Sequence, residues 1–361
     1  MPGPAKQGLL DMIDHAQSKG FSLRWACRII GVDHARVIGW REAVTTGKGL
    51  EDARPGPEPG EALHALLDWE IAAIKELAGQ WGQIDLSHRK LAHRGSRLDL
   101  VYVAESTVLR VLTAAGMHLP GIPRIPRDNA KKPWPDWVEL VPGQIYIYDF
   151  THFKRLRGWC AIAVIDVVSK FWYSTVLSPE ETWVQVETAF IAALEADGKS
   201  WLLDEGLRAD LDTGVIPDDD DRVPVLLAVS DNGPQMTSSN TKRFMAMARI
   251  VQHFGRPGTP NDQAWIESFF SHLKAENPQL NTISDPAELR RELDACRDRY
   301  NNVRLHEGIG YVTPADEHYG RGEAIRDART KGLRNARATR IETHRQIRQN
   351  PTTETQPDAD L

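Results

Sequence analysis

The spacing of hydrophobic residues changes near residue 140, and the change predicts two kinds of structure in one chain. Before this point, apolar residues recur at three- and four-residue intervals, which is typical of amphipathic helices. After it, short runs rich in β-branched and aromatic residues are joined by tight connections. These runs are QIYIYDF (144–150), CAIAVIDVV (160–168) and FWYSTVL (171–177). They predict three successive strands in an antiparallel meander.

The segments after the meander predict how the sheet is completed. The continuous apolar run VPVLLAVS (223–230) predicts a strand that is buried on both faces. A short strand is expected near 250–254, and helices are expected near 180–197, 237–249, 262–276 and 286–301. This order predicts an α/β, ribonuclease H-like core with a mixed five-stranded sheet, over residues 141–320, preceded by all-α units.

The first of these units, residues 1–50, is predicted to be a helix-turn-helix. Ser22 can cap a helix that Gly31 stops, and Asp33 can cap the next one. On this second helix Arg36 and Arg41 are expected to face outward, where they could contact DNA. The alternative interpretation is a small helical hairpin with no DNA-binding role.

A second helical unit is expected at 61–118, after a linker at 51–60 that is rich in proline and glycine. A long helix over about 61–79 comes first, and two shorter helical segments then resemble another helix-turn-helix. The predicted phosphate contacts of this unit are Arg89, Lys90, Arg94 and Arg110. A solvated helical spacer is the alternative.

Two further basic segments flank the core. The linker at 119–140 contains five prolines between residues 120 and 135, so an extended backbone is expected there. Its basic residues Arg124, Arg127, Lys131 and Lys132 either follow a DNA backbone or keep the linker soluble. Residues 321–361 are expected to be a basic tail of uncertain order, since 321–348 holds nine basic and three acidic residues.

The net charge of −6 argues at first against a DNA partner, because duplex-binding proteins usually carry a positive excess. The segment 204–222 holds eight acidic residues and two arginines, so it accounts for the whole excess. The rest of the chain is balanced, with 42 basic and 42 acidic residues. A DNA partner is therefore compatible with the charge, while the role of the acidic insert at 204–222 is unexplained.

The composition also bears on the compartment. Cys27, Cys160 and Cys296 lie far apart, which argues against a disulfide framework or a zinc site and fits a reducing cytoplasm. No apolar run reaches the roughly 18 residues of a membrane span, and no secretion signal is recognisable. We therefore expect a cytoplasmic protein with no membrane partner.

Three carboxylates are placed where catalytic groups are expected. Asp149 lies near the end of the first predicted strand, and Asp231 directly follows the buried strand. Glu267 lies in the helix predicted at 262–276, on the same side as Lys274. Converging carboxylates repel one another unless cations lie between them. Hard oxygen ligands favour Mg²⁺ or Mn²⁺, and two such ions per active site are usual in phosphodiester chemistry.

At this point the chain resembles a known family. Asp231 and Glu267 are separated by 35 residues, the spacing of the retroviral-type integrase core that many bacterial insertion-sequence transposases share. The matching motifs are YDFTHF around Asp149, SDNGP around Asp231, RPGTPNDQAWIESFFSHLKAE (256–276) and YNNVRLHEGIGYVTPAD (300–316). The resemblance is strong over 141–316 and loose over 5–116. Gln263, where the family often has asparagine, and the long acidic insert depart from the pattern.

The resemblance implies a DDE recombinase of the second-reading-frame transposase type. Asp149, Asp231 and Glu267 would bind the metal ions and catalyse, Lys274 would contact the end of the element's DNA, and Asp166 would be structural. Arg304, next to the last helix, would either shape that helix or contact DNA. Cleavage would free a 3′-hydroxyl that attacks target DNA, and joining two ends would require a homo-oligomer on double-stranded DNA. A partner protein encoded in an upstream frame is a further possible requirement.

Two other functions stay open from the sequence. One is a catalytically silent DNA-binding regulator derived from a transposase, and the intact set of three acids counts against it. The other is a ribonuclease H-like nuclease. The two upstream DNA-binding candidates argue for site selection, which a general nuclease does not need.

Overall fold

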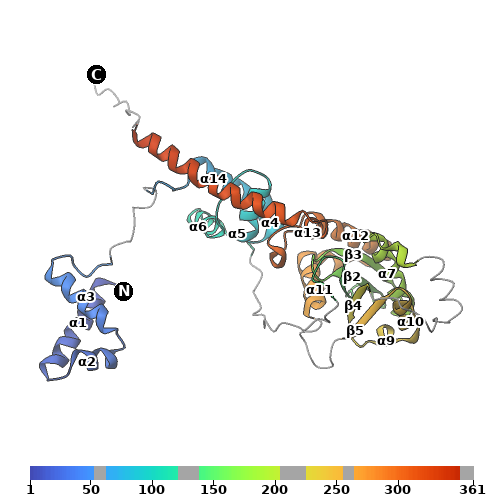
Figure 1. Ribbon diagram of the computed structural model, residues 1–361, viewed down its shortest axis with the longest axis horizontal. Coiled ribbons are helices and arrows are strands. Elements are labelled where there is room, and N and C mark those ends of the chain that lie inside the picture. Colours follow the sequence, from blue (N-terminus) through green and yellow to red (C-terminus); the bar gives the residue numbers. More distant parts are fainter. Residues whose placement is uncertain (53–61, 121–137, 204–224, 255–263, 350–361) are drawn as a thin grey trace, which may run out of the picture. The chain divides into compact units, whose positions relative to one another are not determined.

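The computed structural model describes residues 1–52, 62–120, 138–203, 225–254 and 264–349 (Figure 1). It forms two compact units, one made of Met1–Leu66 with Arg340–Leu361 and the other of Leu67–Thr339. Residues 53–60 of the linker at 51–60, nearly all of the basic linker at 119–140 and the acidic insert at 204–222 lie outside the described residues. Within the described residues, none of the helices combines the length and the apolar character that a membrane crossing requires.

The first unit begins with three helices whose predicted ends are confirmed. The helices are α1 (Gly3–Ser18), α2 (Leu23–Ile30) and α3 (His34–Thr45). The Ser22 side chain accepts a hydrogen bond from the Trp25 backbone nitrogen at 3.3 Å, and Gly31 ends α2 with a φ of 76°. Asp33 caps α3 by accepting from the Ala35 nitrogen at 2.8 Å. The core of these helices contains Leu10, Ile13, Ala26, Cys27 and Val37.

The sheet of the second unit has the predicted strands and the predicted mixed topology. The strands are β1 (Ile145–His152), β2 (Cys160–Asp166), β3 (Trp172–Ser178), β4 (Leu226–Ser230) and β5 (Ile250–Phe254). Their order is β3-β2-β1-β4-β5. β1, β2 and β3 pair antiparallel, so the meander is confirmed, and β4 and β5 pair parallel to β1. This is the sheet of a ribonuclease H-like fold, which confirms the predicted fold class.

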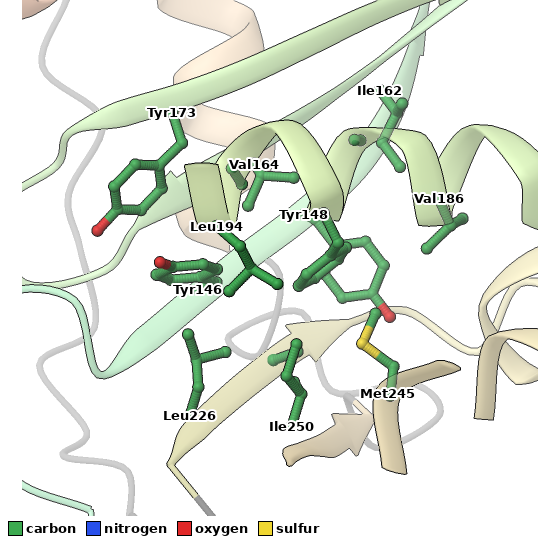
Figure 2. Packing of buried hydrophobic residues seen from close by; sticks show 14 of the residues in the cluster. Tyr146, Tyr148, Ile162, Val164, Tyr173, Val186, Leu194, Leu226, Met245 and Ile250 are labelled. Atoms are coloured by element: carbon green, nitrogen blue, oxygen red, sulfur yellow. The ribbon is translucent and has the colours of Figure 1, made fainter. Parts of the chain in front are cut away.

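Helices cover both faces of this sheet. They are α7 (Trp183–Ala196), α9 (Pro234–Thr237), α10 (Ser239–Met247), α11 (Ala264–Glu276) and α12 (Pro286–Asn302), with short 3₁₀ turns at Ser200–Leu203 and Pro278–Asn281. Side chains alternate along a strand, so even-numbered residues of β1 such as Tyr146 and Tyr148 pack under α7 (Figure 2). The odd-numbered residues Ile145 and Ile147 pack on the opposite face with α11 and α12.

The helical segment before the core belongs to the same compact unit as the sheet. It consists of α4 (Asp68–Asp85), α5 (His88–Arg97) and α6 (Glu105–Ala114). The long helix expected over 61–79 starts later because Glu70 accepts from the Leu67 backbone nitrogen at 2.9 Å and so fixes the first turn. The Arg94 guanidinium on α5 donates to the Val303 carbonyl after α12 at 2.7 Å, which joins this helical segment to the core.

The C-terminal part of the chain is more ordered than its composition suggested. After a 3₁₀ turn at Glu307–Ile309 come α13 (Pro314–His318) and the 28-residue helix α14 (Gly322–Gln349). The basic tail predicted at 321–361, whose order the sequence left uncertain, is therefore helical up to Gln349. Its alanine, arginine and glutamate residues favour a helix. Arg329 also fixes the helix against α5 by donating to the Ala92 carbonyl at 2.8 Å.

Candidate active site

Asp149 lies near the carboxyl end of β1, on the face of the sheet that α11 covers. It follows Ile145 and Ile147 in the alternation, and these two pack with Ile266 of α11 in one cluster. Its Oδ1 accepts a hydrogen bond from the Phe150 backbone nitrogen at 2.7 Å. The strand therefore presents this carboxylate toward the helix that carries Glu267.

The pairing of β4 with β1 brings Asp231 to the same place. Ile145 pairs with Leu227 and Ile147 with Val229 in a parallel register. Continuing this register by two residues sets Asp231, which follows β4, beside Asp149. Its carboxylate accepts from the Gly233 nitrogen at 3.0 Å, so the turn itself orients the side chain.

Glu267 lies in the first turn of α11 and is exposed. Its helix is held on the sheet by Ile266, Phe269 and Leu273, which belong to the same cluster as the odd-numbered residues of β1. Glu267 therefore lies on the other side of the helix from these buried residues, as helical periodicity requires. The three acids thus come from two neighbouring strand ends and the helix that covers them.

The electrostatics of Asp149 show that these acids influence one another. Burial, together with the charges of Asp231, Glu267 and Glu181, raises the pKa of Asp149 to about 7, although the hydrogen bond from the Phe150 nitrogen opposes the rise. Among the described residues, no three histidine, cysteine, aspartate or glutamate side chains stand close enough to hold a metal ion as they are placed. The donors are all carboxylate oxygens, which suit a hard divalent cation, and such an ion would relieve their mutual repulsion.

The raised pKa of Asp149 has a consequence for stability without metal. Below pH 4 the carboxyl is protonated in both the folded and the unfolded chain, so it does not affect the free energy of unfolding. Between pH 4 and 7 it ionises only in the unfolded chain, so that free energy falls as the pH rises. Asp149→Asn is expected to make the metal-free protein about 2–4 kcal/mol more stable than the unsubstituted protein at pH 8.

At pH 4 the two proteins are expected to differ by less than about 1 kcal/mol, because the carboxyl is protonated in the folded chain and only about half ionised in the unfolded chain. Urea unfolding in the presence of a chelator, at pH 4 and pH 8, measures the difference. Equal stabilities at both values would contradict the burial of an ionised carboxylate at this position.

Lys274 links the Glu267 helix to the Asp149 strand. Its ammonium donates to the Thr151 hydroxyl at 2.6 Å and to the His152 carbonyl at 2.8 Å, and it lies 5.3 Å from the centre of the Phe153 ring. Burial, followed by the charge of Lys154, lowers its pKa. The residue predicted to contact DNA thus ties α11 to the end of β1, and the DNA contact stays a prediction.

The structure contradicts the interpretation of Arg94 as a phosphate contact. Its side chain is 4% exposed and its guanidinium donates two hydrogen bonds of 3.0 Å to Asp85, whose side chain is 1% exposed. It also lies 4.2 Å over the ring of Trp81. A helix this rich in basic residues suggested a solvated face. Arg94 is buried instead because Asp85, nine residues earlier, forms an ion pair with it.

Other predicted DNA contacts are already paired with acids. Arg304 forms two parallel hydrogen bonds with Glu276, at 2.8 and 2.7 Å, so it shapes the end of α12. Arg89 donates to Glu307 at 3.1 Å, and Arg41 pairs with Asp14 of α1. Lys90 is largely buried, and burial and the charge of Arg304 lower its pKa to about 8.

Two predicted contacts face solvent. Arg36 on α3 and Arg110 on α6 are both exposed. Arg124, Arg127, Lys131 and Lys132 lie outside the described residues. The structure therefore leaves one exposed arginine on each of the two helices predicted to recognise DNA.

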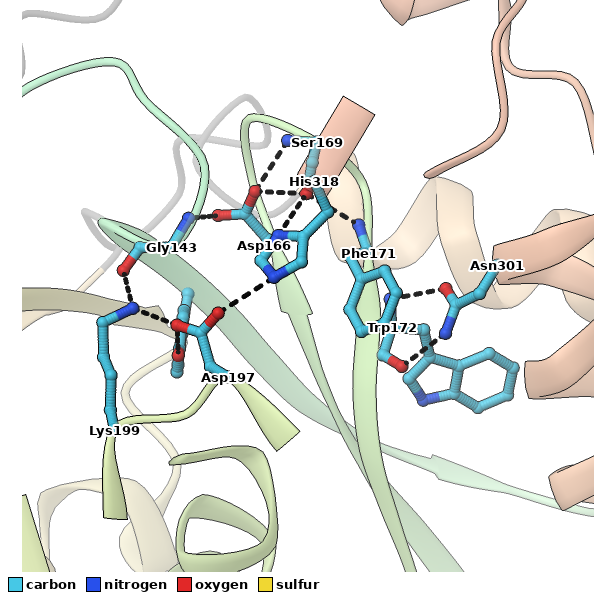
Figure 3. A network of polar contacts seen from close by, with 10 residues as sticks. Gly143, Asp166, Ser169, Phe171, Trp172, Asp197, Lys199, Asn301 and His318 are labelled. Carbon is cyan, nitrogen blue, oxygen red and sulfur yellow. Dashed lines mark hydrogen bonds and ion pairs between the residues drawn. The ribbon is translucent and has the colours of Figure 1, made fainter. Parts of the chain in front are cut away.

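Asp166 lies on the other face of the sheet, within a buried polar network (Figure 3). It is fully buried and accepts from the Ser169 hydroxyl at 2.5 Å and from the Gly143 nitrogen at 3.2 Å. Burial raises its pKa, although these hydrogen bonds oppose the rise. His318 of α13 joins the network between Ser169 and Asp197, at 3.3 and 3.0 Å. This placement fits the structural role expected for Asp166.

Three further residues lie around the acids, and the sequence pattern did not indicate them as part of the site. Glu181, in the loop between β3 and α7, lies 3.3 Å from His152 and accepts from the Gln235 amide at 3.0 Å. Neither helical nor strand periodicity connects these positions. Only the strand order, which brings the ends of β1 and β4 together, could have indicated them.

Comparison with known proteins identifies the core. A model of the integrase core domain family matches residues 248–314, the segment that contains Glu267 and Lys274. The transposase of insertion sequence element IS904 from Lactococcus lactis is 27% identical over 268 residues, which cover 72% of this chain and 96% of that protein. Residues 248–314 thus match the integrase core domain family, and most of the chain is similar to an insertion-sequence transposase.

Further relatives agree with this relationship. The transposase of insertion sequence element IS629 from Shigella sonnei is 26% identical over 181 residues, half of this chain and 53% of that protein. Among solved structures, the catalytic core of BIV integrase is similar with 19% identity and a TM-score of 0.35, covering 50% of this chain and 97% of that one. The HTLV-2 integrase core in complex with magnesium gives the same identity and TM-score, with 50% and 98% coverage.

Proposed function

We propose that this chain is a DNA transposase that cleaves the ends of a mobile element and joins the freed 3′-hydroxyl to target DNA. One observation carries the proposal: Asp149 near the end of β1 and Asp231 directly after the neighbouring β4 lie on the sheet face that the Glu267 helix covers. The relationship to insertion-sequence transposases supports the choice of DNA as the substrate.

Asp149, Asp231 and Glu267 would hold two Mg²⁺ or Mn²⁺ ions. When bound, such cations neutralise the charge that develops on the phosphate during an in-line displacement and favour ionisation of the attacking hydroxyl. The raised pKa of Asp149 supports this assignment, since carboxylates that disfavour one another's charge gain from a cation between them. The magnesium bound in the HTLV-2 integrase core is consistent with the same choice.

Basic residues outside the active site are proposed to bind and orient DNA. The exposed arginines Arg36 and Arg110 are proposed to contact phosphates from α3 and α6, and the basic linker at 119–140 is proposed to follow the backbone. Joining two ends in one event requires at least two protomers. We therefore propose that the active form is a homo-oligomer assembled on DNA.

The test is a reaction of the purified chain with Mg²⁺ and labelled DNA from the ends of its own element. Cleavage at the 3′-end followed by joined products is expected, and both should be absent with the Glu267→Gln variant. Tight binding without products, in Mn²⁺ as well, would contradict an activity of this chain alone and favour a regulator or a missing upstream-frame partner. Cutting of an RNA–DNA hybrid without joining would favour a nuclease.

A further inference from the structure

Glu181 uses its two carboxylate oxygens on two different segments. Its Oε2 lies 3.3 Å from Nε2 of His152, and its Oε1 accepts a hydrogen bond of 3.0 Å from the amide of Gln235. His152 is the last residue of β1, three residues after Asp149, and Gln235 lies in α9, four residues after Asp231. One side chain therefore bridges the two strand ends that carry the two aspartates.

On the β4 side, this bridge reaches the turn of Asp231 itself. A Cβ placed on Gly233 would lie 2.8 Å from Nε2 of Gln235 and 3.1 Å from Oδ1 of Asp231. The Gln235 amide thus packs against the glycine whose nitrogen donates to the Asp231 carboxylate. Displacing Gln235 would leave this turn free to change its conformation and redirect the carboxylate.

The end of β1 has a second contact, which comes from α11. Lys274 of α11 donates to the Thr151 hydroxyl and to the His152 carbonyl. The end of β1 is therefore fixed between α11, which carries Glu267, and the loop that carries Glu181. All three elements that bear the acids are cross-linked through these few residues.

The loop that presents Glu181 is itself anchored at both of its ends. The Glu180 nitrogen donates to the Ser178 hydroxyl at 3.0 Å, and the Thr182 nitrogen donates to the Gln185 side chain at 3.0 Å at the start of α7. Hydrogen bonds therefore fix the backbone on both sides of Glu181. The side chains of Glu181 and His152 are 36% and 64% exposed, so their contact contributes little to the free energy of unfolding.

We propose that Glu181 is a positioning residue, which holds the strand ends carrying Asp149 and Asp231 at their working separation. The inference rests on the proposed function and adds to it a role for a fourth acid. Reacting groups displaced by about 1 Å can cost about 100-fold in rate. Loss of the bridge should therefore reduce the rate of catalysis and leave DNA binding and overall stability nearly unchanged.

The test compares Glu181→Ala with Glu181→Gln in the full-length protein, and uses the exposed neighbour Glu180 as a control through Glu180→Ala and Glu180→Gln. Glu181→Ala is expected to lower kcat for end cleavage about 10- to 100-fold, with KM for DNA within about twofold. Glu181→Gln is expected to restore most of kcat, since its amide oxygen can accept from Gln235 while its amide nitrogen contacts the His152 ring. Both Glu180 variants should react as the unsubstituted protein does.

Hydrogen exchange on the DNA-free protein tests the bridge independently of activity. In Glu181→Ala, the backbone amides of 150–153 and 232–236 should exchange at least about fivefold faster, and in Glu181→Gln they should not. Unchanged exchange in Glu181→Ala would overturn the proposal even for an inactive protein. A Glu181→Gln protein as slow in cleavage as Glu181→Ala would also overturn it, because the charge itself would then be needed. Absence of products from the unsubstituted protein would count against the proposed function alone.

Discussion

Replacement of Asp149, Asp231 or Glu267 by the corresponding amide is expected to lower DNA joining by at least about 100-fold while DNA binding is retained. Each amide keeps the size of the side chain but removes a negative charge and one strong oxygen donor for a divalent cation. The three acids come from β1, the turn after β4 and α11, so none of them can substitute for another. Quantifying joined products and measuring binding to labelled ends on the same preparations checks both parts.

Glu195→Gln is the matched control for this series. Glu195 is an exposed acid on α7, the helix that covers the other face of the sheet. The Glu195→Gln variant should join DNA as the unsubstituted protein does. Retention of more than a few per cent of joining by any of the three amide variants would contradict the assignment of that acid.

Arg94→Met is expected to destabilise the second unit by about 3–5 kcal/mol. The substitution leaves the carboxylate of Asp85 without its partner at a site that is 1% exposed, and it removes a donor from the Val303 carbonyl. An uncompensated buried charge is the main cost. Urea unfolding, followed through far-ultraviolet circular dichroism, measures the change.

Two further variants separate this cost from a general effect of losing an arginine. Arg110→Met removes an exposed arginine from the neighbouring helix α6 and should change stability by less than about 0.5 kcal/mol. Combining Arg94→Met with Asp85→Leu should recover a large part of the loss, since no charge is then left buried. Equal losses in the single and the double variant would show that the buried charge is not the cause.

Much of the sheet and of the candidate site could be predicted because their signals are local. Each strand appears as an apolar run of its own, and the carboxyl ends of β1 and β4 carry Asp149 and Asp231 directly in the sequence. The side of α11 on which Glu267 lies follows from helical periodicity alone. Ser22 and Asp33 likewise cap their helices through contacts with residues two or three positions away.

The roles of the charged residues were harder to predict because their partners are distant in sequence. Arg94 reaches Val303, Arg89 reaches Glu307 and Lys274 reaches Thr151. No periodicity distinguishes such a cation from one that faces solvent. The helix α14 was missed for another reason: a sequence with few large apolar residues resembles a tail unless a contact such as that of Arg329 with α5 holds it.

The hydrogen bond from Arg94 to Val303 couples the unfolding of the helices α4–α6 to that of the five-stranded sheet. A ligand bound by these helices lowers the free energy of the states in which the helices are folded, and the hydrogen bond extends this stabilisation to the sheet. It therefore protects the sheet against unfolding as well as the helices. By reciprocity, loosening the sheet weakens the binding of that ligand by the same free energy.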